Sequence, residues 1–329
     1  MTAPLAHLNH VILGGNGIVG RETARALLER GQTVASVGRR PSTVAGVRSI
    51  TGDLLTPATV RDALVGADVA YLTVGIEYST RAWAQQWPIV MANSIDAAIA
   101  HDTHLIYFDN VYAYGLVAGP MTENSPIRPS SKKGQTRADA LAMLSAAATS
   151  RGLRYTVARS ADFYGPGATT SVLNSFAIDK IVTGHTGMWL YNADQLHSFT
   201  YTPDIGDGLA ILGTTPRDNG TVWHLPTSPA LTGREYLRIA SGSDAAPKIM
   251  SKTMMRIGGI FIKDARESLE LSYQNTEPYV FDSSAFEARF GVTPTPIAEG
   301  IAASLLASLS ASQAASRAAS LAASPTISA

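Results

Sequence analysis

Cysteine is absent from this chain of 329 residues. Its absence excludes disulfide bonds, cysteine nucleophiles and thiolate metal sites. An excess of charge is lacking too, because 26 basic residues balance 26 acidic ones, so nothing favours nucleic acid or an anionic membrane as a partner. No apolar run is long enough to span a bilayer, and the start MTAPLAHLNH lacks the features of a secretion signal. These absences predict a cytoplasmic protein without a nucleic-acid or membrane partner.

Candidate strands alternate with candidate helices from the N-terminus to about residue 165. The strands are expected at residues 10–13, 33–40, 68–75, 103–115 and 153–165, and the helices at residues 21–31, 56–66, 87–102 and 137–152. This βαβ spacing predicts a parallel sheet that helices cover on both faces.

A glycine-rich turn, GGNGIVG, joins the first candidate strand to the first candidate helix. Gly14, Gly17 and Gly20 allow a tight turn, close approach of the backbone to a pyrophosphate and close packing of helix on strand. The N-terminus of the following helix offers free N–H groups to phosphates. The turn therefore predicts dinucleotide binding, with Asn16 and Ile18 of the same loop among the binding residues.

The next strand indicates which dinucleotide is bound. NAD-dependent enzymes usually carry an acidic residue at its end, to hold the ribose 2′-hydroxyl. Here the strand ends in SVGRR, so that Gly38 stands in that position and Arg39 and Arg40 follow. Two guanidinium groups would bind a 2′-phosphate, and the sequence therefore predicts NADP(H) as the cofactor.

Beyond Gly165 the alternation loosens into short segments punctuated by Pro, Gly and Thr. The expected fold class is α/β, a Rossmann-like doubly wound parallel sheet with a smaller C-terminal α+β substrate lobe. The expected domains are an NADP-binding domain at residues 1–165 and a substrate lobe at residues 166–303, from which a strand or helix can return to the first domain. Residues 304–329 form an Ala/Ser-rich tail, expected as a surface helix that frays into disorder.

Six motifs follow one another along the chain. They are GGNGIVG, GDL at residues 52–54, YLTVG at 71–75, NVYAYG at 110–115, RSADFYGPG at 159–167 and FTYTPDIGDGL at 199–209. In their order and spacing the chain resembles the short-chain dehydrogenase/reductase superfamily, in its extended epimerase/dehydratase-like branch. The resemblance implies cofactor contacts from Asp53 and Leu54 at the adenine, from Thr73, Val74 and Gly75 at the ribose and phosphates, and from Ala161 and Asp162 at the nicotinamide. It also makes a homodimer possible.

The catalytic positions of the family are changed in this chain. The resemblance implies a Ser or Thr, and a Tyr-x-x-x-Lys pair on one helix face, but no Tyr here has a Lys four residues later. Lys133 takes the Tyr position, Arg137 the Lys position and Asn110 the Ser/Thr position, which resembles an atypical subgroup without the Tyr. We expect Lys133 to act as an acid or to hold a carbonyl oxygen, and also to contact the cofactor; Asn110 would donate to a developing oxyanion and Arg137 would bind an anion.

Other residues are alternatives for proton transfer or for substrate contact. Asp109, Tyr112, Tyr114 and Tyr164 are candidate acids or bases, and a substrate is expected to contact Tyr112, Tyr164 and Trp189. The second lobe also offers Tyr191, His197, Trp223 and His224, which are equally suited to a core. No metal site is expected, because His101 and His104 lack a third ligand and are expected at the surface.

Three functions follow from these residues. The first is an NADPH-dependent oxidoreductase that reduces a C=O, C=N or activated C=C bond of a small-molecule substrate. The second is an NAD(P)-dependent epimerase or dehydratase acting on a sugar-like substrate, and the third is a non-catalytic NADP(H) sensor or scaffold. The missing Tyr favours the first over the second, since epimerisation needs a competent base.

Overall fold

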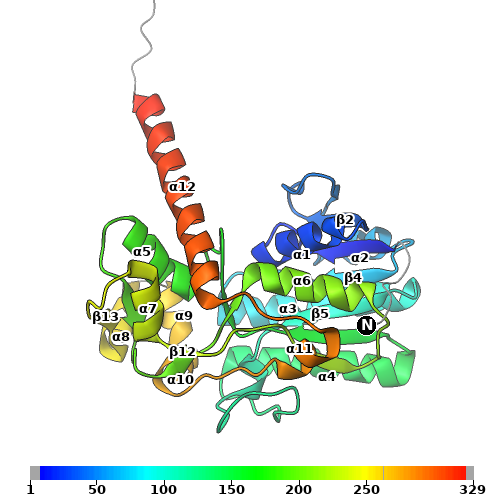
Figure 1. The fold of residues 1–329 in the computed structure, drawn as a ribbon. Helices are drawn as coiled ribbons and strands as arrows, with labels where there is room; N and C mark the ends of the chain where they lie inside the picture. The colour runs from blue at the N-terminus through cyan, green and yellow to red at the C-terminus, as the bar shows by residue number, and fades with distance from the viewer. Residues whose placement is uncertain (1–7, 262, 324–329) are drawn as a thin grey trace, which may run out of the picture.

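A computed structural model of the chain describes residues 8–261 and 263–323. Its largest element is a parallel seven-stranded sheet with the order β11-β6-β5-β4-β1-β2-β3 (Figure 1). The strands are β1 (Asn9–Leu13), β2 (Thr33–Gly38), β3 (Arg48–Thr51), β4 (Val69–Leu72), β5 (His104–Asp109), β6 (Tyr155–Arg159) and β11 (Thr221–His224). The chain builds outward from β1 through β2 to β3 and then from β4 through β5 to β6, so the order reverses between β1 and β4. A doubly wound sheet binds its ligands outside the carboxyl ends of the strands at such a switch point.

Helices cover both faces of the sheet, as the alternating pattern predicts. One face carries α2 (Pro57–Ala63), α3 (Thr80–Ala100) and α4 (Lys132–Arg151), and the other carries α1 (Ile18–Glu29), α6 (Thr202–Thr214) and α11 (Ser284–Phe290) (Figure 1). Central strands such as β4 are buried along their whole length, which explains why their sequences read as apolar runs without alternation.

Two helices begin earlier than the sequence indicates. The start of α3 was expected at residue 87, but Ser79 caps the helix and accepts a hydrogen bond from the Ala82 N–H. Pro88 therefore lies inside the helix, although proline usually stands in the first turn. The helix continues past it because Trp83 and Trp87 are both buried against the sheet. Likewise α4 begins at Lys132 behind the cap of Ser131.

The second lobe combines short strands and helices. Its elements are β7 (Asp162–Tyr164), η2 (Asn174–Ile178), α5 (Asp179–Val182), β8 (Met188–Leu190), β9 (Leu196–His197), β10 (Phe199–Tyr201), β12 (Leu231–Thr232), α7 (Gly233–Ser241), β13 (Lys248–Met250), α8 (Lys252–Phe261), α9 (Lys263–Ser268), η3 (Leu269–Leu271) and α10 (Tyr273–Thr276). Between β5 and α4 lies the short helix η1 (Tyr112–Tyr114). After building part of this lobe, the chain returns to the sheet with α6 and β11.

The Ala/Ser-rich tail begins as a helix that packs on the second lobe. It is the larger part of α12 (Ile297–Ala323), whose first turns contact α5 and α7 and whose later turns project from the body (Figure 1). Residues 324–329, where fraying was expected, lie outside the described residues. Within the described part of the chain, no helix combines the length and hydropathy needed to cross a membrane.

Candidate active site

The glycine turn closes tightly against the neighbouring strand end. Gly14 has a φ of +97°, and a Cβ at this position would lie 2.4 Å from the Cα of Val74. A Cβ on Gly20 would lie 2.6 Å from the Cα of Gly15. Both positions therefore need glycine for steric reasons. Gly17 differs, since its Cβ would meet nothing closer than the Gly14 carbonyl oxygen at 3.4 Å, which leaves room beside the backbone.

This turn fits the phosphates of a dinucleotide. Helix α1 starts directly after Gly17 without a side-chain cap and has no acidic residue in its first turn, so its first N–H groups are available to an anion. Asn16 donates from Nδ2 to the carbonyl oxygen of Arg40 at 2.6 Å. Its Oδ1 is buried and accepts no hydrogen bond from any residue that the structure describes. This acceptor suits a ribose hydroxyl.

The residues expected at the adenine end follow the carboxyl ends of β2 and β3. Arg39 and Arg40 are exposed just after β2 and pair with no carboxylate among the described residues. Asp53 is exposed, and its Oδ1 accepts from the Leu55 N–H at 3.0 Å. Leu54 is buried, and its carbonyl oxygen accepts from Nδ2 of Asn93.

The residues after β4 border the same edge. The Thr73 N–H donates to the Leu13 carbonyl oxygen at 3.0 Å, which continues the pairing of β4 with β1. Val74 is the residue that Gly14 approaches, and a Cβ on Gly75 would meet no atom within 4 Å. Ile18 opens α1 in the same region. The chain thus brings the expected cofactor residues to one edge, on either side of the switch point.

Lys133 lies at the start of α4, fully buried, and all its protons face acceptors. Nζ lies 2.8 Å from Oε2 of Glu267, 2.8 Å from Oε1 of Glu270 and 2.8 Å from the Glu267 carbonyl oxygen. It also lies 3.1 Å from Oγ1 of Thr80. Four acceptors surround three N–H bonds, so this arrangement leaves no donor for a substrate oxygen. The expectation of a lysine that is free to act on substrate does not agree with this geometry.

The same two carboxylates cap two helices. Glu267 Oε2 accepts from the N–H of Thr80, the first residue of α3, at 2.7 Å. Glu270 Oε2 accepts from the N–H of Lys132, the first residue of α4, at 2.9 Å. Burial alone would raise the pKa of Glu267, but hydrogen bonds from Lys133 and Thr80 outweigh it and lower that pKa to about 2. The carboxylates thus occupy a place that suits anions, with two helix N-termini and an ammonium.

Arg137 is buried in the core, so the anion-binding role expected for it does not agree with its position. Its guanidinium carbon lies 4.7 Å from the ring centroid of Trp83 and 4.0 Å from that of Trp87. Nη1 donates to the Tyr107 hydroxyl at 2.6 Å, and Nε lies 3.7 Å from a carboxylate oxygen of Asp109. The guanidinium is stacked on two indole rings and hydrogen-bonded to a phenol, an arrangement that a lysine could not reproduce. Asp109 also pairs with Arg159. Arg137 and Asp109 therefore stabilise the core rather than offering a catalytic group.

Asn110 and Tyr112 lie just beyond the carboxyl end of β5 and are partly exposed. Oδ1 of Asn110 accepts from the Tyr112 N–H at 3.0 Å, whereas its Nδ2 has no partner among the described residues and remains a donor. Tyr112 stacks on Trp83 and interacts with Tyr78. Burial raises the pKa of both tyrosines well above its ordinary value. They can donate a hydrogen bond but are poor bases near neutral pH.

Trp189 and Tyr164 lie in the core of the second lobe, where a substrate would not reach them. Trp189 is buried and stacks on Tyr236, with ring centroids 5.9 Å apart. The Tyr164 ring is buried so closely against α12 that a Cβ on Gly300 would lie 2.3 Å from its hydroxyl. The substrate contacts expected of Trp189 and Tyr164 therefore do not agree with this geometry. Sequence alone could not distinguish them from Tyr112, because buried and ligand-facing aromatics look the same in a sequence.

Asp162 follows β6 at the carboxyl edge and meets the second lobe. The N–H of Ala161 donates to Thr200 Oγ1 at 3.1 Å, and that of Asp162 donates to the Tyr279 hydroxyl at 3.2 Å. A carboxylate oxygen of Asp162 lies 3.1 Å from Nε2 of His197. The expected backbone contacts to a nicotinamide are thus already paired, while the Asp162 side chain remains partly exposed.

Several residues of this edge were not found from the sequence. They are Tyr78, Thr80, Glu267, Glu270, Tyr273 and Tyr279, which lie far along the chain from Lys133 and Asp162. None of them belongs to a motif with a recognisable spacing. The one indication that the sequence offers is that Tyr78 and Thr80 follow shortly after a candidate strand, where ligand-binding residues of such sheets often lie.

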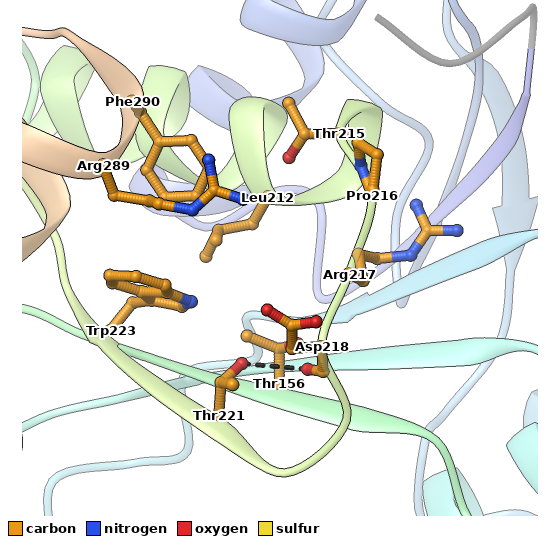
Figure 2. Close-up of a pocket in the computed structure, with 10 residues that line it drawn as sticks. All are labelled: Thr156, Leu212, Thr215, Pro216, Arg217, Asp218, Thr221, Trp223, Arg289 and Phe290. Atoms are coloured by element: carbon orange, nitrogen blue, oxygen red, sulfur yellow. Dashed lines mark hydrogen bonds between the residues drawn. The ribbon is translucent and has the colours of Figure 1, made fainter. Parts of the chain in front are cut away.

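The expected surface histidines and the candidate metal ligands lie away from this edge. His104 is buried, with Nε2 2.9 Å from Thr156 Oγ1, so the surface placement expected for it is wrong; it begins a central strand. Among the described residues no cluster of three metal-ligating side chains occurs. A shallow hollow between Trp223, Arg289 and Arg217 (Figure 2) lies at the amino-terminal ends of β6 and β11. The glycine turn lies at the opposite edge of the sheet. Ligands of doubly wound sheets bind at that carboxyl edge and not at the edge where this hollow lies.

Solved structures share this fold across nearly the whole chain. UDP-glucuronic acid 4-epimerase from Bacillus cereus, in complex with UDP-glucuronic acid and NAD, has 17% identity and a TM-score of 0.76, covering 92% of this chain and 100% of that one. A double mutant of DesIV, a dTDP-glucose 4,6-dehydratase from Streptomyces venezuelae with NAD bound, has 17% identity and a TM-score of 0.74, covering 91% and 96%. UDP-glucose 4-epimerase from Thermus thermophilus, in complex with NAD, has 18% identity and a TM-score of 0.71, covering 92% and 99%.

Comparison of the sequence with individual curated proteins finds no match. The model of the NAD dependent epimerase/dehydratase family, however, matches residues 10–225, from the first strand of the sheet to just beyond the last. The chain therefore belongs to the NAD dependent epimerase/dehydratase family.

Proposed function

We propose that this chain is a nicotinamide-dinucleotide-dependent enzyme of the epimerase or dehydratase type, acting on a hydroxyl-bearing, sugar-like small molecule. The observation that carries the proposal is the turn from Gly14 to Gly20. It combines close backbone packing, an uncapped helix N-terminus and the unpaired Oδ1 of Asn16 in a chain of this family. The order of preference expected from the sequence is thereby reversed, because both the family match and the solved structures of similar fold favour this chemistry over a reductase.

The substrate would lie at the carboxyl edge of β4, β5 and β6, beside the second lobe. In a doubly wound sheet the two halves of a dinucleotide lie on either side of the switch point. The half beyond β4 faces Asn110 and Asp162, which follow β5 and β6. Amide and carboxylate groups with neighbouring phenols suit a ligand that is rich in hydroxyls.

The chemistry divides between the cofactor and the protein. A bound nicotinamide would accept hydride from a hydroxyl carbon and return it. Asn110 would hold the substrate oxygen through its free Nδ2, which stabilises negative charge as it develops. Lys133 would act indirectly, because its bonds to Glu267 and Glu270 hold the second lobe against the N-termini of α3 and α4.

The cofactor preference is proposed to be NADP(H). Arg39 and Arg40 are exposed beyond the end of β2, and Asn16 fixes their backbone through its bond to the Arg40 carbonyl oxygen. A 2′-phosphate on the adenine ribose would meet two guanidinium groups there. The same observation supports a second candidate function, an NADPH-dependent reductase of a carbonyl in a small molecule.

Binding and turnover test these proposals separately. Isothermal titration with NAD⁺, NADH, NADP⁺ and NADPH should give binding with preference for the phosphorylated pair, and absence of binding would refute the proposal. Nucleotide sugars and free sugars are then incubated with the loaded protein in D₂O. Isomerised or dehydrated product with no net absorbance change at 340 nm supports the epimerase or dehydratase. Stoichiometric oxidation of NADPH by carbonyl compounds would instead support the reductase.

A further inference from the structure

The buried His197 side chain lies between two hydrogen-bond acceptors. Its Nδ1 lies 3.0 Å from the carbonyl oxygen of Gln274, and its Nε2 lies 3.1 Å from Oδ2 of Asp162. A carbonyl oxygen can only accept, so Nδ1 carries a proton. An ionised carboxylate also only accepts, whereas a neutral imidazole has a single N–H. The contact between Nε2 and Oδ2 therefore offers a place for one further proton beside a neutral imidazole and an ionised carboxylate.

A second buried histidine shows the ordinary arrangement. His224 has Nδ1 2.8 Å from the carbonyl oxygen of Asp282 and Nε2 2.8 Å from the Tyr114 hydroxyl. The hydroxyl can donate to Nε2, so one acceptor and one donor satisfy a neutral ring. Burial lowers the pKa of His224 to about 3, in agreement with a neutral side chain. The place for a further proton is thus a property of the Asp162 site and is not shared by His224.

The pair lies where proton transfer would be needed. Asp162 is three residues beyond the end of β6, on the half of the sheet edge that lies across the switch point from the glycine turn. The His197 side chain is 2% exposed, whereas that of Asp162 is 21% exposed. Oδ1 of Asp162 has no hydrogen-bond partner among the described residues. A substrate could therefore reach the pair through this oxygen.

The groups around the carboxylate do not compete for this role. The titratable side chains that face Asp162 are His197, Tyr78 and Tyr112, together with Tyr273 and Tyr279 of the second lobe. Burial raises the pKa of each phenol, that of Tyr273 to about 12. They remain neutral donors near pH 7. Lys133, at the position of the family's tyrosine, has all its protons engaged.

We propose that Asp162, supported by His197, exchanges the proton with the substrate oxygen and so replaces the tyrosine that this chain lacks. When the substrate carbon gives hydride to the nicotinamide, the hydroxyl proton passes to the Asp162 carboxylate and the carbonyl forms. The reverse step returns hydride to carbon and the proton to oxygen, so no further oxidant or reductant is needed. This inference rests on the function proposed above.

Proton release on cofactor binding tests the inference without a substrate. The oxidised nicotinamide carries a positive charge that the reduced ring lacks, and a positive charge beside the pair favours loss of its proton. Titrations of NADP⁺ and NADPH in buffers of different ionisation enthalpy give the number of protons released. We expect NADP⁺ to release a few tenths of a proton more than NADPH per site near neutral pH. In Asp162→Asn and in His197→Gln this difference should vanish.

Matched variants and a kinetic readout complete the test. Asp194→Asn and His185→Gln change exposed residues away from the edge and should keep the wild-type difference. With any substrate that is turned over, Asp162→Asn should lower kcat about 10²- to 10⁴-fold and remove a limb of the pH profile, with cofactor affinity within about threefold. An equal proton release for both cofactors in the wild type, or an unchanged difference in Asp162→Asn, would overturn the inference. If neither cofactor binds, the proposed function itself fails.

Discussion

The Nζ atom of Lys133 lies 2.8 Å from a carboxylate oxygen of Glu267, which is 134 residues further along the chain. The bond joins the first turn of α4 to α9 of the second lobe, and Glu270 adds an equal bond from η3. Lys133, the residue that we expected at the position of the family's tyrosine, thus connects the two lobes in this protein.

Replacing Lys133 by Met should destabilise the protein. The substitution removes the one cation from between two partly buried carboxylates, and breaking a buried ion pair on one side costs about 3–5 kcal/mol. We expect the free energy of unfolding by urea to fall by about that amount. Lys132→Met is the matched control, because Lys132 is the exposed neighbour and should change stability by no more than about 0.5 kcal/mol.

Neutralising Glu267 and Glu270 as well should restore part of the stability that Lys133→Met loses. The triple variant Lys133→Met, Glu267→Gln, Glu270→Gln leaves no unpaired charge. If it is no more stable than Lys133→Met alone, the lysine does not act through these two residues.

Gly14→Ala should abolish dinucleotide binding and lower stability. An alanine here must hold a φ of +97° and place its Cβ 2.4 Å from the Val74 Cα, so the turn must open. We expect a loss of about 1–3 kcal/mol from backbone strain alone, and at least a hundredfold weaker binding of NADP⁺ by isothermal titration.

Gly66→Ala separates strain from contact. Gly66 also has a positive φ, of +72°, but its Cβ would meet no atom within 4 Å. It should lose stability without losing affinity. Equal losses of affinity in both variants would mean that the approach of Gly14 to Val74 is not what forms the phosphate site.

Arg39→Ala should weaken binding of NADPH much more than binding of NADH. A hydrogen bond to a charged group contributes about 1.5–3 kcal/mol, which corresponds to roughly a tenfold to hundredfold change in Kd. Fluorescence titration of both cofactors measures the ratio. Arg48→Ala is the control, because Arg48 lies at the amino-terminal end of β3, away from the carboxyl edge. This variant should leave the ratio of the two affinities unchanged. Equal losses for NADPH and NADH in Arg39→Ala would refute binding of a 2′-phosphate by this residue.

Stability should fall as the pH drops below about 6.5. Burial lowers the pKa of His104 and of His224 to about 3, whereas the unfolded chain takes up protons near pH 6.5. The unfolded state therefore binds more protons between these values, and stability decreases with falling pH. Each histidine should account for up to about 2 kcal/mol between pH 6.5 and pH 5.

Urea unfolding at pH 7.5, 6.5, 5.5 and 5.0 checks this dependence. The double variant His104→Asn, His224→Asn should show a flatter profile, even if its stability at pH 7.5 is lower. His185→Gln, which alters an exposed histidine, should keep the wild-type slope. This range lies above the region between about pH 4.5 and pH 2 in which Glu267 loses its stabilising charge.

The sequence predicted what depends on neighbouring residues and missed what depends on distant ones. Alternating strands and helices and the turn at Gly14 follow from local patterns, and the parallel sheet is confirmed. The partners of Lys133 are Glu267 and Glu270. No sequence motif connects these residues to Lys133, so the ion pairs could not be predicted. His197 was recognised only as one of several aromatic residues, because its meaning depends on Asp162, which is 35 residues away.

Arg137 shows a different limit. The resemblance to the family implied that Arg137 takes the position of a lysine, and from this we expected an anion-binding role. The guanidinium instead stacks on Trp83 and Trp87, two residues of α3 whose orientation is decided by the packing of the helix. A motif gives the position of a side chain on a helix, but not the environment that neighbouring helices create.

The return of the chain to the sheet determines when the protein can fold during synthesis. Strand β11 pairs with β6, and α6 packs on α1, although about 60 residues of other structure separate β6 from β11. Until residue 224 has left the ribosome, the nascent sheet ends at β6 with an unpaired edge, and the face of α1 that α6 covers remains exposed. An edge and an apolar face of this kind are ready contacts for other unfinished chains. A ribosome that stalls before residue 224 would therefore leave an aggregation-prone intermediate rather than a finished cofactor-binding domain.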